Sequence, residues 1–145
     1  MAEDRSSTSS FSSPSLAVPR ERQSVVLFLV FLGGAMGALA RELMAPFLPA
    51  PWFWFPILLI NVSASFFMGW LFTRRRRWHP YWTHMLVGGF CGGFSTFSHF
   101  TYELVTLADA GRLLEAAAYV LLAVFLGIGA AVAGERLGSR TGGIP

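Results

Sequence analysis

The sequence predicts an all-α membrane protein with four transmembrane helices. Hydrophobic residues make up 54% of its 145 residues and charged residues only 13%, which is about half the charged share of a soluble domain. The mean hydropathy is +0.53, and four long apolar segments account for it. A soluble domain of this length has too little interior to bury so much apolar surface. The composition therefore argues against a cytosolic globular enzyme.

The first 23 residues differ in composition from the rest of the chain. Seven serines and two prolines fall in this stretch. Such a composition cannot bury enough apolar surface to fold, so residues 1–23 are predicted to form a disordered cytoplasmic tail. The alternative is a secretory signal, because Arg20 and Arg22 precede an apolar run and residues 38–40 resemble a cleavage site. The long polar stretch that precedes the apolar run disfavours a secretory signal.

A four-helix domain is predicted over residues 24–136, followed by a flexible C-terminal tail at 137–145. The apolar segments of this domain run over about 25–44, 53–73, 82–107 and 113–134. Each is close to or above the roughly 20 residues that a helix needs to cross hydrocarbon. A helix also pairs its backbone groups within the segment, as lipid requires. Four prolines between 46 and 56 mark the first connection as a loop.

The basic residues are all arginine, and their distribution predicts the orientation in the cell membrane. One side of a four-helix chain carries nine of them: Arg5, Arg20, Arg22, Arg74, Arg75, Arg76, Arg77, Arg136 and Arg140. The other side carries Arg41 and Arg112. Positive residues remain in the cytoplasm, so both termini are predicted there. The run at 74–77 could alternatively bind nucleic acid or phospholipid. An anchor that fixes the orientation in the membrane is the simpler interpretation. No nucleic-acid partner is therefore expected.

The third segment carries the most informative run, GGFCGGFSTFSHFT at residues 88–101. Its four glycines have the spacing of closely packed membrane helices. That packing does not explain the neighbouring hydroxyl side chains. A helix interrupted near the bilayer midplane, with freed backbone groups presented to an ion, is the other interpretation. Spacing alone leaves both open.

Four further side chains have both a packing and a functional interpretation. Phe97 and Phe100 share a helix face; they either pack in the core or present electropositive ring edges to a small anion. Asn61 lies near the middle of the second segment, where it either bonds another helix or lines a pore. Arg41 either snorkels to the membrane surface or concentrates anions at a pore mouth.

Enzymatic chemistry has little support in the sequence. The three histidines, at 79, 84 and 99, lack metal-ligand spacing, and Glu42 and Glu103 fall toward segment ends. The single cysteine, Cys91, excludes an intramolecular disulfide framework. We therefore expect no enzyme activity. No internal repeat is present, so a symmetric transport pathway would need a second chain.

Taken together, these motifs resemble the Fluc (CrcB) fluoride channel family. The residues that carry the resemblance are GGAMGALAR at 33–41, Asn61 with Ser65, GFCGGFSTFSHF at 89–100, and Glu103. It covers about residues 25–134. The resemblance implies a third helix broken near its middle and an antiparallel dimer with two fluoride pathways, each lined by both chains.

The resemblance also implies site residues. The fluoride pathway would comprise Asn61, Phe97, Ser98, Phe100, Thr101 and Tyr119. Gly92 and Ser95 would hold a structural Na⁺ at the dimer centre through their backbone carbonyls. Three features depart from the family pattern: His99 lies beside the second phenylalanine, Ala123 and Gly127 replace frequent serines, and the arginine bias is strong. We hypothesise that protonation of His99 modulates conduction.

The sequence is therefore expected to encode a fluoride-selective channel that passively exports fluoride across the cell membrane and reduces its toxicity in the cytoplasm. The channel would contact fluoride and membrane lipid. It would pair either with itself or, as the arginine bias favours, with an oppositely oriented homologous subunit. One alternative is a small four-helix multidrug or cation exporter, which needs a carboxylate deep in its first helix, whereas Glu42 is near the end of that segment. A non-transporting assembly subunit is a third possibility.

Overall fold

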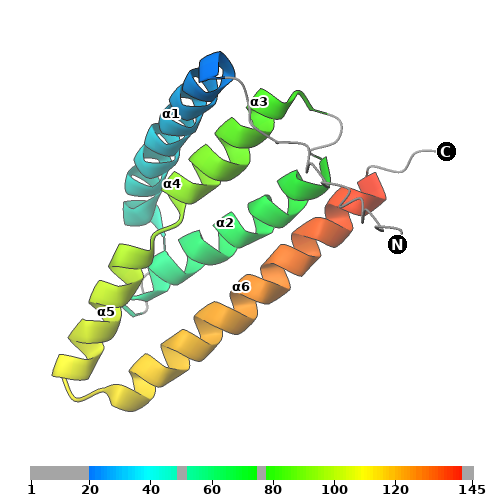
Figure 1. The fold of residues 1–145 in the computed structure, drawn as a ribbon. Coiled ribbons are helices and arrows are strands. Elements are labelled where there is room, and N and C mark those ends of the chain that lie inside the picture. Colours follow the sequence, from blue (N-terminus) through cyan, green and yellow to red (C-terminus); the bar gives the residue numbers. More distant parts are fainter. Residues whose placement is uncertain (1–19, 49–51, 75–77, 142–145) are drawn as a thin grey trace, which may run out of the picture.

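The computed structural model describes residues 20–48, 52–74 and 78–141, which form an all-helical arrangement (Figure 1). The elements in chain order are α1 (Arg20–Met44), the 3₁₀ turn η1 (Ala45–Phe47), α2 (Phe55–Arg74), α3 (Pro80–Thr83), the π-helix η3 (His84–Cys91), α4 (Gly92–Phe94), α5 (Phe97–Asp109) and α6 (Leu113–Thr141). Most of the predicted tail, residues 1–19, lies outside the described residues, as do 75–77 of the arginine run.

Three helices in the described part of the chain are long and apolar enough to cross a membrane. The spans are Arg22–Phe47, Phe55–Arg74 and Leu113–Arg140, and they contain the first, second and fourth predicted segments. The predicted third span, 82–107, is divided among α3, η3, α4 and α5, none of which is long enough by itself. The third segment is thus built differently from the other three.

The helix ends differ from the predicted boundaries at both termini. Helix α1 already begins at Arg20, and α6 continues to Thr141, so residues 137–141 of the predicted flexible tail are helical. The cause is close packing of α6 against α2. A Cβ added at Gly134 would overlap the Phe66 carbonyl, and one at Gly138 would overlap the Thr73 side chain. These glycines are contact points between two helices and do not end α6.

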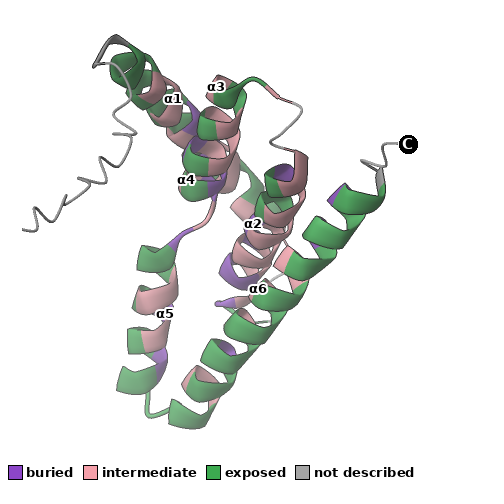
Figure 2. Ribbon diagram, turned by 45° about the vertical axis from the view of Figure 1, so that its right-hand side comes forward, coloured by how far each residue is buried: buried purple, intermediate pink, exposed green. Residues whose placement is uncertain are grey.

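Helices α2 and α6 lie side by side along most of their length, whereas α1 packs on η3 and α4 (Figures 1 and 2). Glycines make the second contact possible. A Cβ at Gly37 would overlap the Phe90 carbonyl, and one at Gly93 would overlap the backbone of Gly34. A Cβ at Gly92, by contrast, would meet no atom within 4 Å. Only some of the third-segment glycines therefore serve close helix packing.

Helix α2 contributes to two buried clusters that flank the interruption between α4 and α5. One cluster comprises Trp54, Leu58, Leu107 and Tyr119, and the other comprises Ile57, Ile60, Ala64 and Phe94. The outward faces of α1 and α6 remain exposed and apolar (Figure 2). Such surfaces suit lipid or a second chain.

Candidate ion site at the helix interruption

The backbone leaves helical geometry for two residues between α4 and α5. Helix α4 ends at Phe94, Ser95 has ψ 156°, and Thr96 has φ −144° and ψ 120°, so both residues are extended. Helix α5 then begins at Phe97, and the Thr96 hydroxyl accepts a hydrogen bond from the His99 amide at 3.3 Å. This is the usual role of threonine at a helix N-cap. The hydroxyl-rich sequence therefore starts a new helix here.

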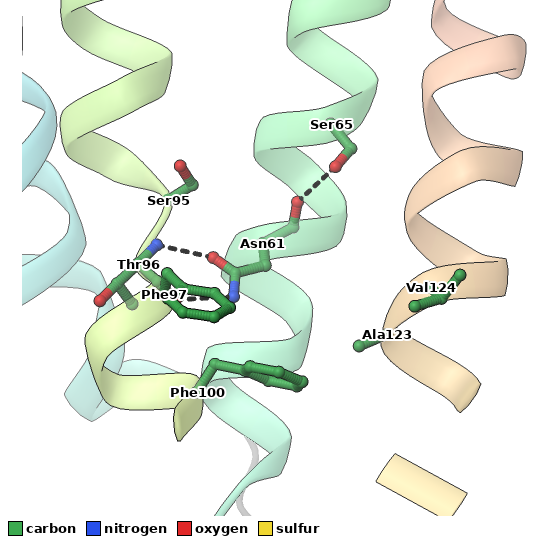
Figure 3. Close-up of a pocket in the computed structure, with 8 residues that line it drawn as sticks. All are labelled: Asn61, Ser65, Ser95, Thr96, Phe97, Phe100, Ala123 and Val124. Atoms are coloured by element: carbon green, nitrogen blue, oxygen red, sulfur yellow. Dashed lines mark hydrogen bonds between the residues drawn. The ribbon is translucent and has the colours of Figure 1, made fainter. Parts of the chain in front are cut away.

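Asn61 on α2 pairs with the interrupted backbone in both directions (Figure 3). The Thr96 amide donates to Asn61 Oδ1 at 2.8 Å, and Asn61 Nδ2 donates to the Thr96 carbonyl at 3.1 Å. An unpaired backbone group in lipid costs several kcal/mol. The side-chain amide thus takes the place of a missing helical neighbour. One of the two Nδ2 hydrogens is donated in this pairing, and the other is available to a further acceptor.

The pairing with Asn61 also changes which carbonyls are available at the end of α4. In a continuous helix the Thr96 amide would bond the Gly92 carbonyl, but here it donates to Asn61. The extended backbone of Ser95 turns its carbonyl out of the helical direction. Carbonyl oxygens are suitable ligands for a hard cation.

A guanidinium group reaches the same end of α4. Arg41 Nη1 lies 3.4 Å from both the Gly93 and the Ser95 carbonyl oxygens, and Arg41 Nε lies 3.3 Å from Glu42 Oε1. The Arg41 side chain is only 16% exposed. Both earlier interpretations of Arg41 placed it at the rim, whereas the structure directs it inward. The C-terminal end of a helix attracts positive charge, which accounts for this orientation.

Three hydroxyl side chains near the interruption are bonded within the chain. Thr96 Oγ1 lies 3.2 Å from both Ser98 Oγ and His99 Nδ1. Thr101 Oγ1 donates to the carbonyls of Phe97 and Ser98. His99 itself is exposed. Ser98 and Thr101 thus lie on the first turns of α5, but neither lines the neighbouring cavity.

An open-sided cavity of about 320 Å³ lies beside the interruption. Its lining residues are Asn61, Ser65, Ser95, Thr96, Phe97, Phe100, Ala123 and Val124 (Figure 3). They come from α2, the interruption, α5 and α6. Three of the six predicted pathway residues, Asn61, Phe97 and Phe100, are therefore brought together here. The surface combines aromatic and aliphatic groups with a few amide and hydroxyl groups.

Three aromatic rings form a row that starts at this cavity. The ring centroids of Phe97 and Phe100 are 6.1 Å apart, and those of Phe100 and Tyr119 are 4.9 Å apart with an edge-to-face tilt of 62°. Phe97 is 76% exposed, whereas Tyr119 is fully buried and donates to Glu103 Oε2 at 2.7 Å. Tyr119 thus connects to the cavity through Phe100.

The α6 side of the cavity lacks hydroxyl groups among its lining residues. Ala123 and Val124 line it, and Gly127 faces Ser65, whose Oγ would lie 3.6 Å from an added Cβ. Ser65 donates to the Asn61 carbonyl at 2.9 Å. Ser65 and Thr96 were not predicted as site residues. Ser65 could have been found from its spacing of four from Asn61, which places both on one helix face.

The comparisons with known proteins agree with the family resemblance. Residues 28–135 match the family model described as "CrcB-like protein, Camphor Resistance (CrcB)". The chain belongs to the CrcB family. The family assignment made from the third-segment run is thereby confirmed, and with its apolar helices the chain is a membrane protein.

Relatives in three bacteria show how far the similarity extends. The fluoride-specific ion channel FluC of Ruegeria pomeroyi is 41% identical over 109 residues, which cover 75% of this chain and 86% of the relative. FluC of Gloeothece citriformis is 34% identical over 122 residues, covering 79% and 97%. FluC 1 of Brucella abortus is 39% identical over 125 residues, or 82% of this chain but 46% of that longer protein.

The pairing of Asn61 with Thr96 predicts a stability loss on truncation. In Asn61→Ala both the amide and the carbonyl of Thr96 lose their partner, at a cost of about 1–3 kcal/mol for each unpaired group. Thermal unfolding in detergent should therefore occur at a clearly lower temperature than in the wild type. Ser65→Ala is the matched control, because it removes one hydrogen bond from the same helix and leaves the pairing intact. Equal melting temperatures for the two variants would contradict the assigned role.

Proposed function

We propose that this CrcB-family chain is a subunit of a fluoride-selective channel that passively exports fluoride across the cell membrane and lowers its toxicity in the cytoplasm. The relatives, which are fluoride-specific ion channels by name, support fluoride as the transported ion. The observation that carries the proposal is the exposed Phe97 ring beside Asn61 at a helix interruption.

Aromatic rings and one amide hydrogen can bind an anion weakly, as conduction requires. The edge of a phenyl ring is electropositive, so Phe97 and Phe100 attract fluoride without a fixed charge. The second Nδ2 hydrogen of Asn61 supplies one stronger contact. Conduction needs binding that is favourable enough for entry and weak enough for release. Ser98 and Thr101 extend the proposed pathway along α5, and Tyr119 extends it toward α6.

No energy source beyond the membrane potential is needed for this export. Neutral HF enters from acidic surroundings and dissociates inside the cell. A membrane potential that is negative inside favours anion exit by about 2.3 kcal/mol per charge at 100 mV. A passive pathway therefore suffices.

A second subunit would close the open side of the cavity. Phe97 is 76% exposed in the single chain, a large exposure for a ring that would contact a dehydrated ion. An antiparallel partner would cover it and double the pathway. This partner could be another copy of the chain or a homologous subunit. The arginine bias favours a homologous subunit of opposite orientation. The same bias supports a cytoplasmic location for both termini.

The carbonyls of Gly92 and Ser95 fit the proposed structural sodium ion in part. The Gly92 carbonyl has lost its helical donor, and the Ser95 carbonyl points away from the helix. Arg41 shares the Ser95 carbonyl, so sodium and a guanidinium group would lie near the same oxygen. Bound sodium would hold the interruptions of two subunits together, while Asn61 pairs each one within its own chain.

Fluoride efflux from proteoliposomes tests the proposal and separates it from a multidrug exporter or an assembly subunit. The chain is reconstituted alone and together with a homologous subunit from the same genome. Fluoride should leave at least one preparation, and Phe97→Ile or Phe100→Ile should reduce the rate at least tenfold, because the ring edges are lost. Phe67→Ile is the control, since Phe67 is exposed on α2 outside the cavity. Absence of efflux in both preparations would contradict the function, and unchanged rates in the phenylalanine variants would contradict the mechanism.

The position of His99 predicts a pH dependence. Its imidazole contacts the Thr96 hydroxyl next to Phe100, and protonation would give the ring a positive charge. The added charge should attract fluoride, so current measured at equal pH on both sides should rise as the pH of both solutions is lowered. His99→Thr should lose this rise. A variant with the wild-type pH dependence would refute the role of His99.

A further inference from the structure

A second cavity, distinct from the ion site, lies where α1 and α3 begin. It has a volume of about 340 Å³ and is lined by Arg22, Val26, His79, Pro80, Tyr81 and His84. The starts of α1 and α3 lie near each other at the upper end of the view in Figure 1, far from the α5–α6 connection. None of these residues lines the cavity at the helix interruption.

The lining of this second cavity is rich in hydrogen-bond donors. Arg22 contributes a permanent positive charge, and Tyr81 contributes a phenol. His79 Nδ1 accepts the backbone N–H of Tyr81 at 3.4 Å, which leaves the proton of the neutral ring on Nε2, where it can be donated. His84 adds a second imidazole. No carboxylate is among the lining residues that the structure describes, so the chemistry favours an anion with several oxygen acceptors.

The residues around the cavity are typical of a membrane surface. Arg22 is the first residue of the α1 membrane span, and Tyr81 is flanked by Trp78 and Trp82, aromatic residues typical of the membrane surface. Val26 forms an apolar wall one turn further along α1. On the adjoining side of α1, at three and ten residues from Arg22, Val25 and Leu32 are exposed. A phosphate at Arg22 would therefore have an apolar surface next to it on the membrane side.

We propose that this cavity binds the phosphate of an anionic glycerophospholipid, with its acyl chains along the exposed face of α1. Arginine binds phosphate through paired, charge-assisted hydrogen bonds, and the imidazole and phenol donors complete the oxygen contacts. Basic pockets between membrane helices are known to suit such headgroups. A lipid here would bridge α1 and α3, and its binding would be independent of the fluoride pathway. Free phosphate shares the headgroup chemistry but not the apolar contact.

Native mass spectrometry of the full chain in detergent, titrated separately with phosphatidylglycerol, phosphatidylcholine and inorganic phosphate, tests this proposal. Phosphatidylglycerol should bind in a saturable way and more tightly than the other two. Arg22→Gln should weaken its binding about fivefold, the effect of one basic side chain at a membrane surface. Arg22→Gln combined with His84→Gln should weaken it further. Arg140→Gln is the control, because Arg140 is an exposed arginine of α6 that lines a different cavity.

Three results would overturn the proposal. Equal losses in Arg22→Gln and Arg140→Gln would mean that the lipid responds only to overall charge. Equal binding of inorganic phosphate and phosphatidylglycerol would mean a free-anion site. Equal binding of phosphatidylcholine would mean that the headgroup charge is not recognised.

Discussion

The two hydrogen bonds between Asn61 and the backbone of Thr96 are the constraint on which the rest of the site depends. They satisfy the amide and the carbonyl of an extended residue at a place where lipid offers no hydrogen-bond partner. Without them, the amide and the carbonyl of Thr96 would both lose their hydrogen-bond partner. The cavity, the outward Ser95 carbonyl and the exposed ring of Phe97 all follow from this one interruption.

Close packing on one side of the third segment allows an open surface on the other. Gly33, Gly37 and Gly93 let α1 approach η3 and α4 so closely that added side chains would overlap backbone atoms. Arg41 then reaches the end of α4 from the same helix. The interruption is thus held from α1 and from α2. Its remaining face carries the polar and aromatic groups and is free to meet an ion or a second subunit.

Much of this arrangement could be predicted from the sequence, and the rest depends on contacts between distant residues. Hydropathy identified the segments that became α1, α2 and α6, and the run at 89–100 identified the family. The role of Arg41 could not be predicted, because its carbonyl partners lie 52 and 54 residues away. The extension of α6 into residues 137–141 could not be predicted, because it depends on the packing of Gly138 against α2.

Fluoride efflux by Asn61→Ala, compared with Ser65→Ala, tests the central claim most directly. Both variants remove a polar group from the same cavity, but only the first breaks the pairing with Thr96. Both are reconstituted in the preparation in which the wild type conducts. The account predicts that Asn61→Ala loses fluoride efflux and that Ser65→Ala stays near the wild-type rate. Wild-type efflux by Asn61→Ala would contradict it.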